Sequence, residues 1–493
     1  MNQKLTTFLI SFFWVTLSCF AQVEVPDKPE LRQSANADEP AFQPFISDSV
    51  LTYAEFIRWV RQYHPMALSA DYGVDLAEGN VRLSRGSFDP LLYGNFRTKE
   101  YSETEYYEAL QAGIEVPTWM GISLQGGYED NGGVFLNPES TVPSRGLFNA
   151  GLSVQLGNGF LFDERRAALR QAQLGVDMSQ NDRIAMLNAL YYEATTAYYR
   201  WALFDRTLQI AEDALVLAAT RYEGVVQSHL LGDLPAIDTV EAYTQVLTRL
   251  FDLREAQNNW IDAANMASVY LWTDEIQPII IPPGLRPEPL TERMGSDSLI
   301  PSSITPFHPD LQKLNLERSS FQIERRLATQ YVLPKVELKY NVLGDNISPA
   351  NAEDYFNESV FFENNYTFGA KVAVPLFMRE GRGKMAMTRV KIDLTTLELE
   401  SKRAQLDAKL NSTLVKLANT RDQVSIFVLN VELLERLLIG ERELFNIGES
   451  SLFLVNSRET KLIEAQVKLV DLIAKERILL AETRVVAGLG FVE

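Results

Sequence analysis

The hydrophobic positions of this chain follow two different periods, and both periods occur twice in the same order. Apolar and polar residues alternate from about 88 to 156 and again from about 333 to 375, which predicts β-strands. Apolar residues then recur every three or four positions over about 65 residues, which predicts a very long helix in each half. A glycine ends each of these helices, and a second long helix follows. Each half is therefore predicted to contain a helix, strands, a long helix, a glycine turn and another long helix.

Matching residues indicate that the two halves are structural repeats. His64 precedes a proline in the first half as His308 does in the second, and Pro90 at a strand start matches Pro334; both pairs are 244 residues apart. A stretch rich in proline, which is stiff and extended, joins the halves. We place the boundaries as follows: first repeat 51–273, with strands at about 88–156; linker 274–306; second repeat 307–493, with strands at about 333–375.

Sequence signals mark where the helices start and how they pack. Thr52 and Glu55 have the spacing of a capping box, in which each side chain accepts a hydrogen bond from the backbone N–H of the other residue. Pro65 interrupts this first helix because it has no N–H to donate. A helix of about 65 residues spans about 100 Å and needs a partner along its length. Leu- and Ala-rich stripes supply that partner face, which predicts two antiparallel coiled-coil pairs per chain.

The strands of the first half are predicted to run up, down, up and down, and the second half adds two more. A tight turn at Pro117 lies at one end, and longer polar loops lie at the other. This asymmetry is typical of outer-membrane barrels, in which aromatic girdles flank the strands. The pattern alone also fits a layer of soluble hairpins with ordinary aromatic packing. The aromatic residues near the strand ends are Tyr101, Tyr106, Tyr107 and Trp119.

The first 21 residues have the features of a secretory signal peptide. A lysine provides the positive charge, residues 9–17 are apolar, and a small residue precedes the expected cleavage point after Ala21. Cys19, the only cysteine, is then removed with the signal; in the alternative, it is the lipidated first residue of a lipoprotein. Residues 22–50, rich in Pro, Asp, Glu and Gln, are predicted to form a flexible extension.

Composition narrows the classes of function. The net charge of −19 argues against a nucleic-acid partner. Although 46% of the residues are hydrophobic, no apolar run after the signal peptide approaches the length of a membrane-spanning helix. A membrane barrel remains compatible with this composition, because the hydropathy averaged over an alternating strand is too low to reveal a membrane segment. His64, His229 and His308 are scattered, and no phosphate loop or catalytic set is recognisable, so we predict no metal site, no cofactor and no enzymatic activity.

Four segments carry a resemblance to a known family. These are VPLFMREGRGK (374–384) and GESSLFLVNSRETKLIEAQ (448–466), with their counterparts QLGNGFLFDERRAAL (155–169) and GDLPAIDTVEAY (232–243). From about residue 51 to 490 the chain resembles the TolC family of outer-membrane efflux proteins. The resemblance implies a mixed α/β membrane protein and a homotrimer. Strands from three chains would close one transmembrane β-barrel among the outer-membrane lipids. This barrel would continue into a long α-helical barrel of antiparallel coiled coils that extends through the periplasm.

The number of strands departs from the family pattern. The sequence predicts six strands per chain, whereas the family pattern has two in each repeat. Either the barrel is enlarged or the hairpin at 106–129 is an insertion, and the insertion is the slightly favoured interpretation.

The resemblance places the functional residues at the tips of the coiled coils, where helix-breaking turns occur at Gly232, Pro235 and Gly448. Asp238 and Glu241 match acidic positions of the family. In a trimer they would form a negative ring that selects cations at the periplasmic constriction. The alternative is a solvated helix start, because an acidic residue also favours a helix N-terminus.

The second repeat differs at the tip. It has no acid at the corresponding positions, which are Leu454 and Ser457. Phe445 and Ser450 stand where the family pattern has a tyrosine and an arginine, so the bonds that close the family's gate cannot form in the same way. We predict a gate with less electrostatic latching, held by apolar packing or by other partners. The apolar residues are Phe445, Leu452 and Phe453.

The function implied by the resemblance is an outer-membrane exit duct that works with a periplasmic adaptor and an inner-membrane pump. Because no nucleotide site or membrane-buried proton relay is evident, the energy for export would come from that pump. The cargo, whether drug, metal ion or protein, stays open. Adaptor contacts are expected near 221–240 and 440–458. The alternative function is a periplasmic coiled-coil adaptor or scaffold.

Overall fold

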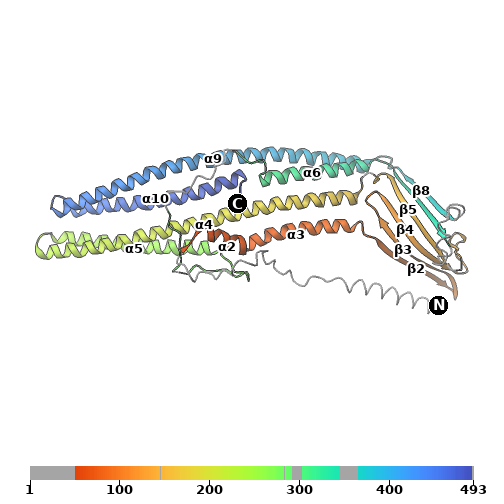
Figure 1. The fold of residues 1–493 in the computed structure, drawn as a ribbon, viewed down its shortest axis with the longest axis horizontal. Helices are drawn as coiled ribbons and strands as arrows, with labels where there is room; N and C mark the ends of the chain where they lie inside the picture. Colours follow the sequence, from red (N-terminus) through yellow and green to blue (C-terminus); the bar gives the residue numbers. More distant parts are fainter. Residues whose placement is uncertain are drawn as a thin grey trace. The chain divides into compact units, whose positions relative to one another are not determined.

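The computed structural model describes residues 50–490 except 145, 161, 283, 291–302 and 345–364. The expected signal peptide, Cys19, residues 22–49 and part of the expected linker lie outside the described residues. Within residues 50–490, a six-stranded β-sheet adjoins the long helices, as Figure 1 shows.

In each half of the chain, a histidine is the N-cap residue of one helix. The capping box predicted at Thr52 is present and starts α2 (Tyr53–Tyr63). His64 then ends α2 and starts α3 (Pro65–Gly86), with its Nδ1 accepting a hydrogen bond of 3.1 Å from the backbone N–H of Met66. His308 starts α6 (Pro309–Gln330) in the same way, with Nδ1 at 3.2 Å from the N–H of Asp310. Nδ1 can accept only when it carries no proton, so both rings are neutral in these caps.

Acid is expected to weaken these two caps. Burial lowers the pKa of His64 and of His308, so the unfolded chain takes up protons first as the pH falls below about 6.5. The stability that the neutral rings contribute is present above that pH and is lost below it. Asparagine caps a helix without titrating. We expect the melting temperature of the variant carrying both His64→Asn and His308→Asn to fall less between pH 7 and pH 5 than that of the parent. An equal fall in both proteins would contradict the role assigned to the histidines.

Six strands form one antiparallel sheet in the order β2–β3–β4–β5–β7–β8. The β3–β4 hairpin therefore lies inside the sheet, between β2 and β5. The structure favours the enlarged sheet over the insertion that the sequence analysis preferred. The strands are β2 (Leu91–Tyr101), β3 (Thr104–Pro117), β4 (Ile122–Gly132), β5 (Leu147–Gly157), β7 (Lys335–Gly344) and β8 (Tyr366–Ala373).

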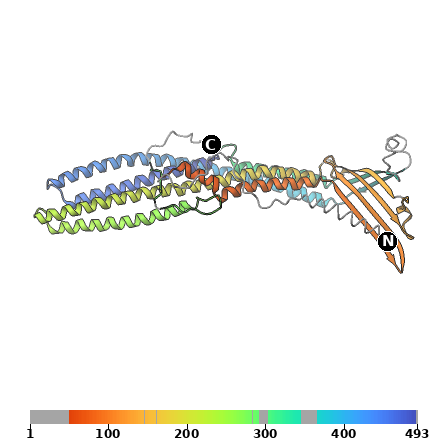
Figure 2. The same cartoon turned by 60° about the horizontal axis from the view of Figure 1, so that its bottom comes forward.

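Two antiparallel pairs of long helices follow the strands, as predicted. Figure 2 shows that α4 returns as α5 and that α9 returns as α10, with the sheet at the opposite end of the helices from the two returns. Between the pairs, α4 contacts α10, and nearer the sheet it contacts α6, which packs on α9. The helices are α4 (Glu164–Leu231), α5 (Ala236–Ser268), α9 (Arg379–Asn446) and α10 (Leu452–Ala487).

An aromatic core joins α2, α4 and the start of the linker. Phe56, Tyr198 and Trp201 are almost fully buried. The Tyr198 hydroxyl donates to the carbonyl of Leu51 at 2.7 Å and accepts from the N–H of Glu288 at 3.0 Å. The same region contains a short parallel pair of strands, β1 (Val50–Leu51) and β6 (Arg286–Pro287). The linker around residues 286–288 is therefore fixed to α4 and to the segment before α2.

None of the described helices has the combination of length and apolar character needed to cross a lipid bilayer. Among the described residues, no group of three or more His, Cys, Asp or Glu side chains could hold a metal ion. The three histidines instead cap helices or close a turn.

Candidate functional site at the helix tips and on the sheet

Each pair of long helices turns at a glycine with a left-handed backbone. Gly232 ends α4 with φ +87°, and Gly448 follows α9 with φ +81°. Glycine adopts this conformation without the steric cost of a side chain. His229 closes the first turn, with Nδ1 at 2.8 Å from the carbonyl oxygen of Leu234. Pro235 is the N-cap residue of α5, as its place in the predicted tip turn requires.

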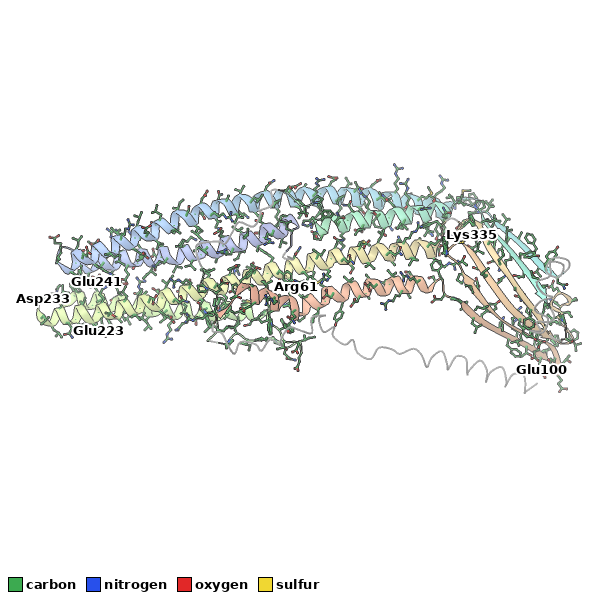
Figure 3. The ribbon with its side chains drawn as sticks, viewed as in Figure 1. Arg61, Glu100, Glu223, Asp233, Glu241 and Lys335 are labelled. Carbon is green, nitrogen blue, oxygen red and sulfur yellow. The ribbon has the colours of Figure 1, made fainter. Side chains whose placement is uncertain are left out.

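The two predicted acidic residues have different surroundings at this tip. Asp238 lies half-buried in the first turn of α5, and its carboxylate has no hydrogen bond or ion pair within the described part of the chain. Glu241, one turn further, accepts a hydrogen bond of 3.1 Å from the side-chain amide of Asn456 on α10. Figure 3 shows Glu223, Asp233 and Glu241 at the end of the α4–α5 pair. The tip is acidic, and within the described part of the chain only Asp238 of the predicted pair has a carboxylate without a partner.

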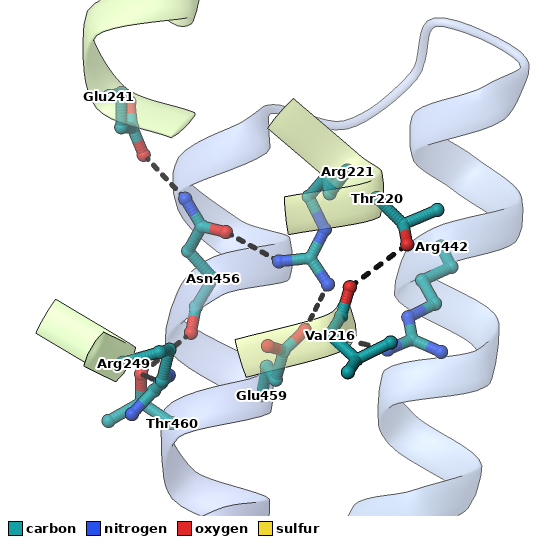
Figure 4. Close-up of polar contacts among 9 residues, drawn as sticks. All are labelled: Val216, Thr220, Arg221, Glu241, Arg249, Arg442, Asn456, Glu459 and Thr460. Atoms are coloured by element: carbon teal, nitrogen blue, oxygen red, sulfur yellow. Dashed lines mark hydrogen bonds and ion pairs between the residues drawn. The ribbon is translucent and has the colours of Figure 1, made fainter. Parts of the chain in front are cut away.

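Arg221 on α4 joins the two helix pairs. Its guanidinium donates to the Asn456 side-chain oxygen at 2.8 Å and forms an ion pair with Glu459. Both partners lie on α10 and are buried, with 5% and 3% of their surface exposed. Asn456 in turn reaches Glu241, so one chain of contacts links α4, α10 and α5, as Figure 4 shows. Sequence reasoning missed Arg221, Asn456 and Glu459.

Further contacts surround this link. Arg249 on α5 is buried and donates to the Thr460 hydroxyl on α10 at 2.7 Å, while its other nitrogen pairs with Asp252 at 3.0 Å. Arg442 on α9 lies 3.4 Å from Glu459. Glu459 therefore has a cation from each helix pair. We name the set Arg221, Glu241, Arg249, Asn456, Glu459 and Thr460 the tip network.

The second-repeat residues predicted at the gate divide into two groups. Phe445 and Leu452 pack with Val225 and Ala242 of the other helix pair, so this part of the predicted apolar contact exists. Phe453 lies outside this cluster, with 66% of its surface exposed in the single chain. A helical position one step from a buried leucine points to another face.

Ser450 and Glu441 form a local contact within the α9–α10 turn. The Ser450 hydroxyl donates to Glu441 at 2.5 Å, and Arg458 lies 3.3 Å from the same carboxylate. The Ser450 hydroxyl and, after it, Arg458 hold the pKa of Glu441 below its usual value. The tip network also connects the helix pairs, through Glu241, which the resemblance indicated, and through Arg221, Asn456 and Glu459, which it did not. Less electrostatic latching of the gate stays a prediction.

At the other end of the chain, the sheet has one apolar face and one polar face across all six strands. The register of the cross-strand pairs decides which side chains share a face. The charged exceptions on the apolar side are Glu100, Glu105, Glu108 and Asp130, and they lie near the loop end of the strands. Representatives of the apolar face, one from each strand in order, are Leu92, Ile114, Leu124, Leu152, Leu338 and Phe368. Representatives of the polar face are Asn95, Gln111, Glu129, Ser153, Lys339 and Lys371.

Local contacts agree with this division. On the polar face, the Gln125 amide donates to the Asn341 side-chain oxygen across β5, where Gly151 has no side chain to intervene. On the apolar face, Tyr128 and Phe148 pack with ring centroids 4.7 Å apart near the loop end. Among the residues of the predicted girdle, Tyr107 lies on the polar face opposite Lys99. Tyr106 lies at a register shift between β2 and β3 and packs against Tyr101 and Lys99.

The single chain leaves apolar surface and strand edges uncovered. β2 and β8 are the two ends of the sheet, and each pairs with one neighbour among the described strands. On α5, Ile237, Val240 and Phe251 expose 67%, 59% and 68% of their surface. On α9, an exposed stripe follows the helical period; it consists of Ile426, Leu429, Leu433, Leu437 and Leu444. Such stripes and edges are typical of surfaces that meet another chain.

Solved structures share this arrangement. No protein-family model matches the chain, and no curated protein matches it in sequence. The CmeC outer membrane channel of Campylobacter jejuni superposes with a TM-score of 0.60 at 12% identity, covering 88% of this chain and 85% of that one. VceC, an outer membrane protein of Vibrio cholerae, gives 0.61 at 14% identity, covering 89% and 96%. The open MtrE outer membrane channel of Neisseria gonorrhoeae gives 0.60 at 12% identity, covering 88% of both chains. The chain therefore has the TolC-like fold of outer membrane channels that its sequence predicts.

Proposed function

We propose that three copies of this chain form an outer-membrane exit duct. The observation that carries the proposal is the two-faced sheet, which is apolar on one side and polar on the other but open at both edges. One sheet cannot stay open in lipid, because unpaired backbone groups there cost several kcal/mol each. Three copies would join β8 of one chain to β2 of the next. The apolar face would then contact outer-membrane lipid, and the polar face would line water.

The helices support the same assembly. The exposed stripes of α5 and α9 lie on different helix pairs, so the α5 stripe of one copy can cover the α9 stripe of its neighbour. Repeated three times around an axis, this heterologous contact closes into a ring. The ring would be a periplasmic tunnel that continues the barrel. The distance along a helix of 68 residues, about 100 Å, sets the scale of that tunnel.

The helix tips would form the entrance to the tunnel. In a trimer, Asp238 occurs three times around the axis, and its free carboxylate would give the entrance a negative potential that favours cations. The tip network would keep each chain's helix pairs together and the entrance narrow. Cargo would arrive from a periplasmic adaptor and an inner-membrane pump, whose contacts we place on the tip surfaces at 221–240 and 440–458.

A periplasmic adaptor or scaffold is the second candidate. It is consistent with the coiled-coil pairs, which adaptors also use. It does not explain why apolar and polar residues separate across all six strands, since a soluble sheet packed on one side would have its apolar face covered. Leu92 and Phe368 expose 62% and 61% of their surface. We therefore prefer the duct.

Recordings from planar lipid bilayers test the duct and its acidic ring together. In cell fractionation, the protein should be found with the outer membrane. After purification in detergent, it should give discrete, cation-selective channels in the bilayer. Asp238→Ala should reduce the preference for cations, because it removes the free carboxylate at the entrance. Asp262→Ala removes an exposed carboxylate further along the same helix, outside the tip network, and serves as the control. Absence of channels from a membrane-inserted protein would exclude the duct. If the Asp238→Ala protein gives channels with unchanged selectivity, the acidic ring is excluded but the duct is not.

A further inference from the structure

We infer that the β3–β4 hairpin is a full part of the lipid-facing wall, so that the barrel is wide enough for bulky hydrophilic cargo. This inference rests on the proposed trimeric duct. The β3–β4 hairpin has two physically possible arrangements in such a duct. The hairpin could complete the wall of the barrel. Alternatively, it could form a lid over the mouth of a narrower barrel, the mouth being the opening at the loop end of the strands.

Pairing along the whole hairpin favours the wall. β3 pairs with β2 from Thr104 to Glu115 and with β4 from Glu108 to Pro117. β4 pairs with β5 from Ile122 to Glu129. A lid would leave β2 and β5 as direct neighbours. Instead, they are separated by two strands that use the hydrogen-bonding edges on both of their sides.

The side chains of the hairpin follow the same two faces as the rest of the sheet. Ile114 on β3 lies between Leu92 on β2 and Gly126 on β4, all on the apolar face. Gln111 lies between Asn95 and Glu129 on the polar face. A hairpin surrounded by water would not need this alternation. Because a shift of one residue would exchange the faces, the register itself is evidence of a wall with lipid on one side.

The turn of the hairpin is fixed against the base of the helices. Thr118 closes it by donating its hydroxyl to the carbonyl of Ile122 at 2.6 Å. Gly121 has φ +78°, and a side chain there would lie 3.1 Å from the carbonyl oxygen of Phe160 and 3.3 Å from the guanidinium of Arg166. The turn therefore lies against the segment that leads into α4, at the end of the sheet opposite the mouth.

The consequence is a wide barrel. Three six-stranded sheets contain eighteen strands. With strands about 4.8 Å apart and tilted by about 40°, eighteen strands close at a diameter of about 36 Å, whereas twelve close at about 24 Å. Barrels of 16–18 strands hold an open aqueous channel.

The polar face mixes both signs of charge, as with Arg97, Glu115, Glu129 and Lys371, so the wide lumen would favour large hydrophilic solutes of either charge. Selection would then occur at the helix tips.

Cysteine labelling of the assembled protein in outer-membrane vesicles tests the inference. Gln111→Cys and Ile114→Cys place a thiol on opposite faces of β3. Ser153→Cys and Leu152→Cys do the same on β5, whose place in the wall does not depend on the hairpin. The parent chain, whose one cysteine is Cys19, provides the background. The reagents are a charged, membrane-impermeant maleimide and a maleimide carried by a bulky polyethylene glycol.

We expect the charged maleimide to label Gln111→Cys at least about tenfold faster than Ile114→Cys, and Ser153→Cys faster than Leu152→Cys by a similar ratio, because a thiol in lipid meets little water. The bulky reagent should also reach Gln111→Cys. If the β5 pair shows the contrast but both β3 positions label alike, the hairpin is a lid and the inference is wrong while the duct stands. If the β5 pair shows no contrast either, the proposed duct itself fails.

Discussion

Replacing Arg221 with alanine is expected to raise the open fraction of the proposed duct by about two orders of magnitude. Arg221 is the cation on α4 that pairs with Glu459 of the opposite helix pair, and its side chain is only 15% exposed. Removing one partner of a buried ion pair costs about 3–5 kcal/mol, and each 1.4 kcal/mol is a factor of ten. We use the lower end of this range, about 3 kcal/mol or two factors of ten, because Arg442 remains 3.4 Å from Glu459. The open fraction is measured by single-channel recording in planar bilayers.

Two further variants make this prediction specific. Arg254→Ala removes an exposed arginine of α5 whose one side-chain hydrogen bond within the described residues is to Gln257 on its own helix, so its open fraction should match the parent. Adding Glu459→Gln to Arg221→Ala removes the buried carboxylate that has lost Arg221 and keeps only the more distant Arg442, and we expect part of the lost stability to return. An Arg221→Ala trimer that stays closed would show that the tip network supports the helices without controlling the entrance.

The second large effect is expected in the sheet, where Leu152→Arg should prevent accumulation of the proposed trimer in the outer membrane. Leu152 lies on the apolar face of β5 between Leu124 and Tyr340. An arginine facing lipid near the middle of a barrel costs about 2–4 kcal/mol, and a trimer bears this cost three times. Ser153→Arg is the matched control, because it places the same charge one residue away on the polar face. The amount of trimer in outer-membrane fractions is compared by gel electrophoresis. Equal loss in both variants would contradict the assignment of the two faces.

The sequence was sufficient for the helices and strands because their signals are local. The capping box at Thr52, the histidine and proline at the start of α3 and α6, and the glycines after α4 and α9 each depend on a few adjacent residues. The alternation along β3 and β4 likewise predicted strands. Whether those strands belong to the main sheet depends on pairing with β2 and β5, which no single strand encodes. For this reason the insertion was preferred over the enlarged sheet.

The tip network could not be predicted for a related reason. Arg221 and Glu459 are 238 residues apart, and nothing in either neighbourhood marks them as partners. Their meeting depends on the contact between α4 and α10, and therefore on the rotation of two long helices about their axes. The family pattern drew attention to Phe445 and Ser450 instead. Phe445 does pack at the tip, but Ser450 contacts Glu441 of its own helix pair.

Electron-microscope images of the detergent-purified protein test the central claim most directly. Three copies should form a tube with threefold symmetry, in which a closed wall of strands continues into a helical tunnel on the scale of about 100 Å set by α4 and α9. The tube should narrow at the turns near Gly232 and Gly448. A compact or filamentous particle without threefold symmetry would contradict the duct and would favour the coiled-coil scaffold.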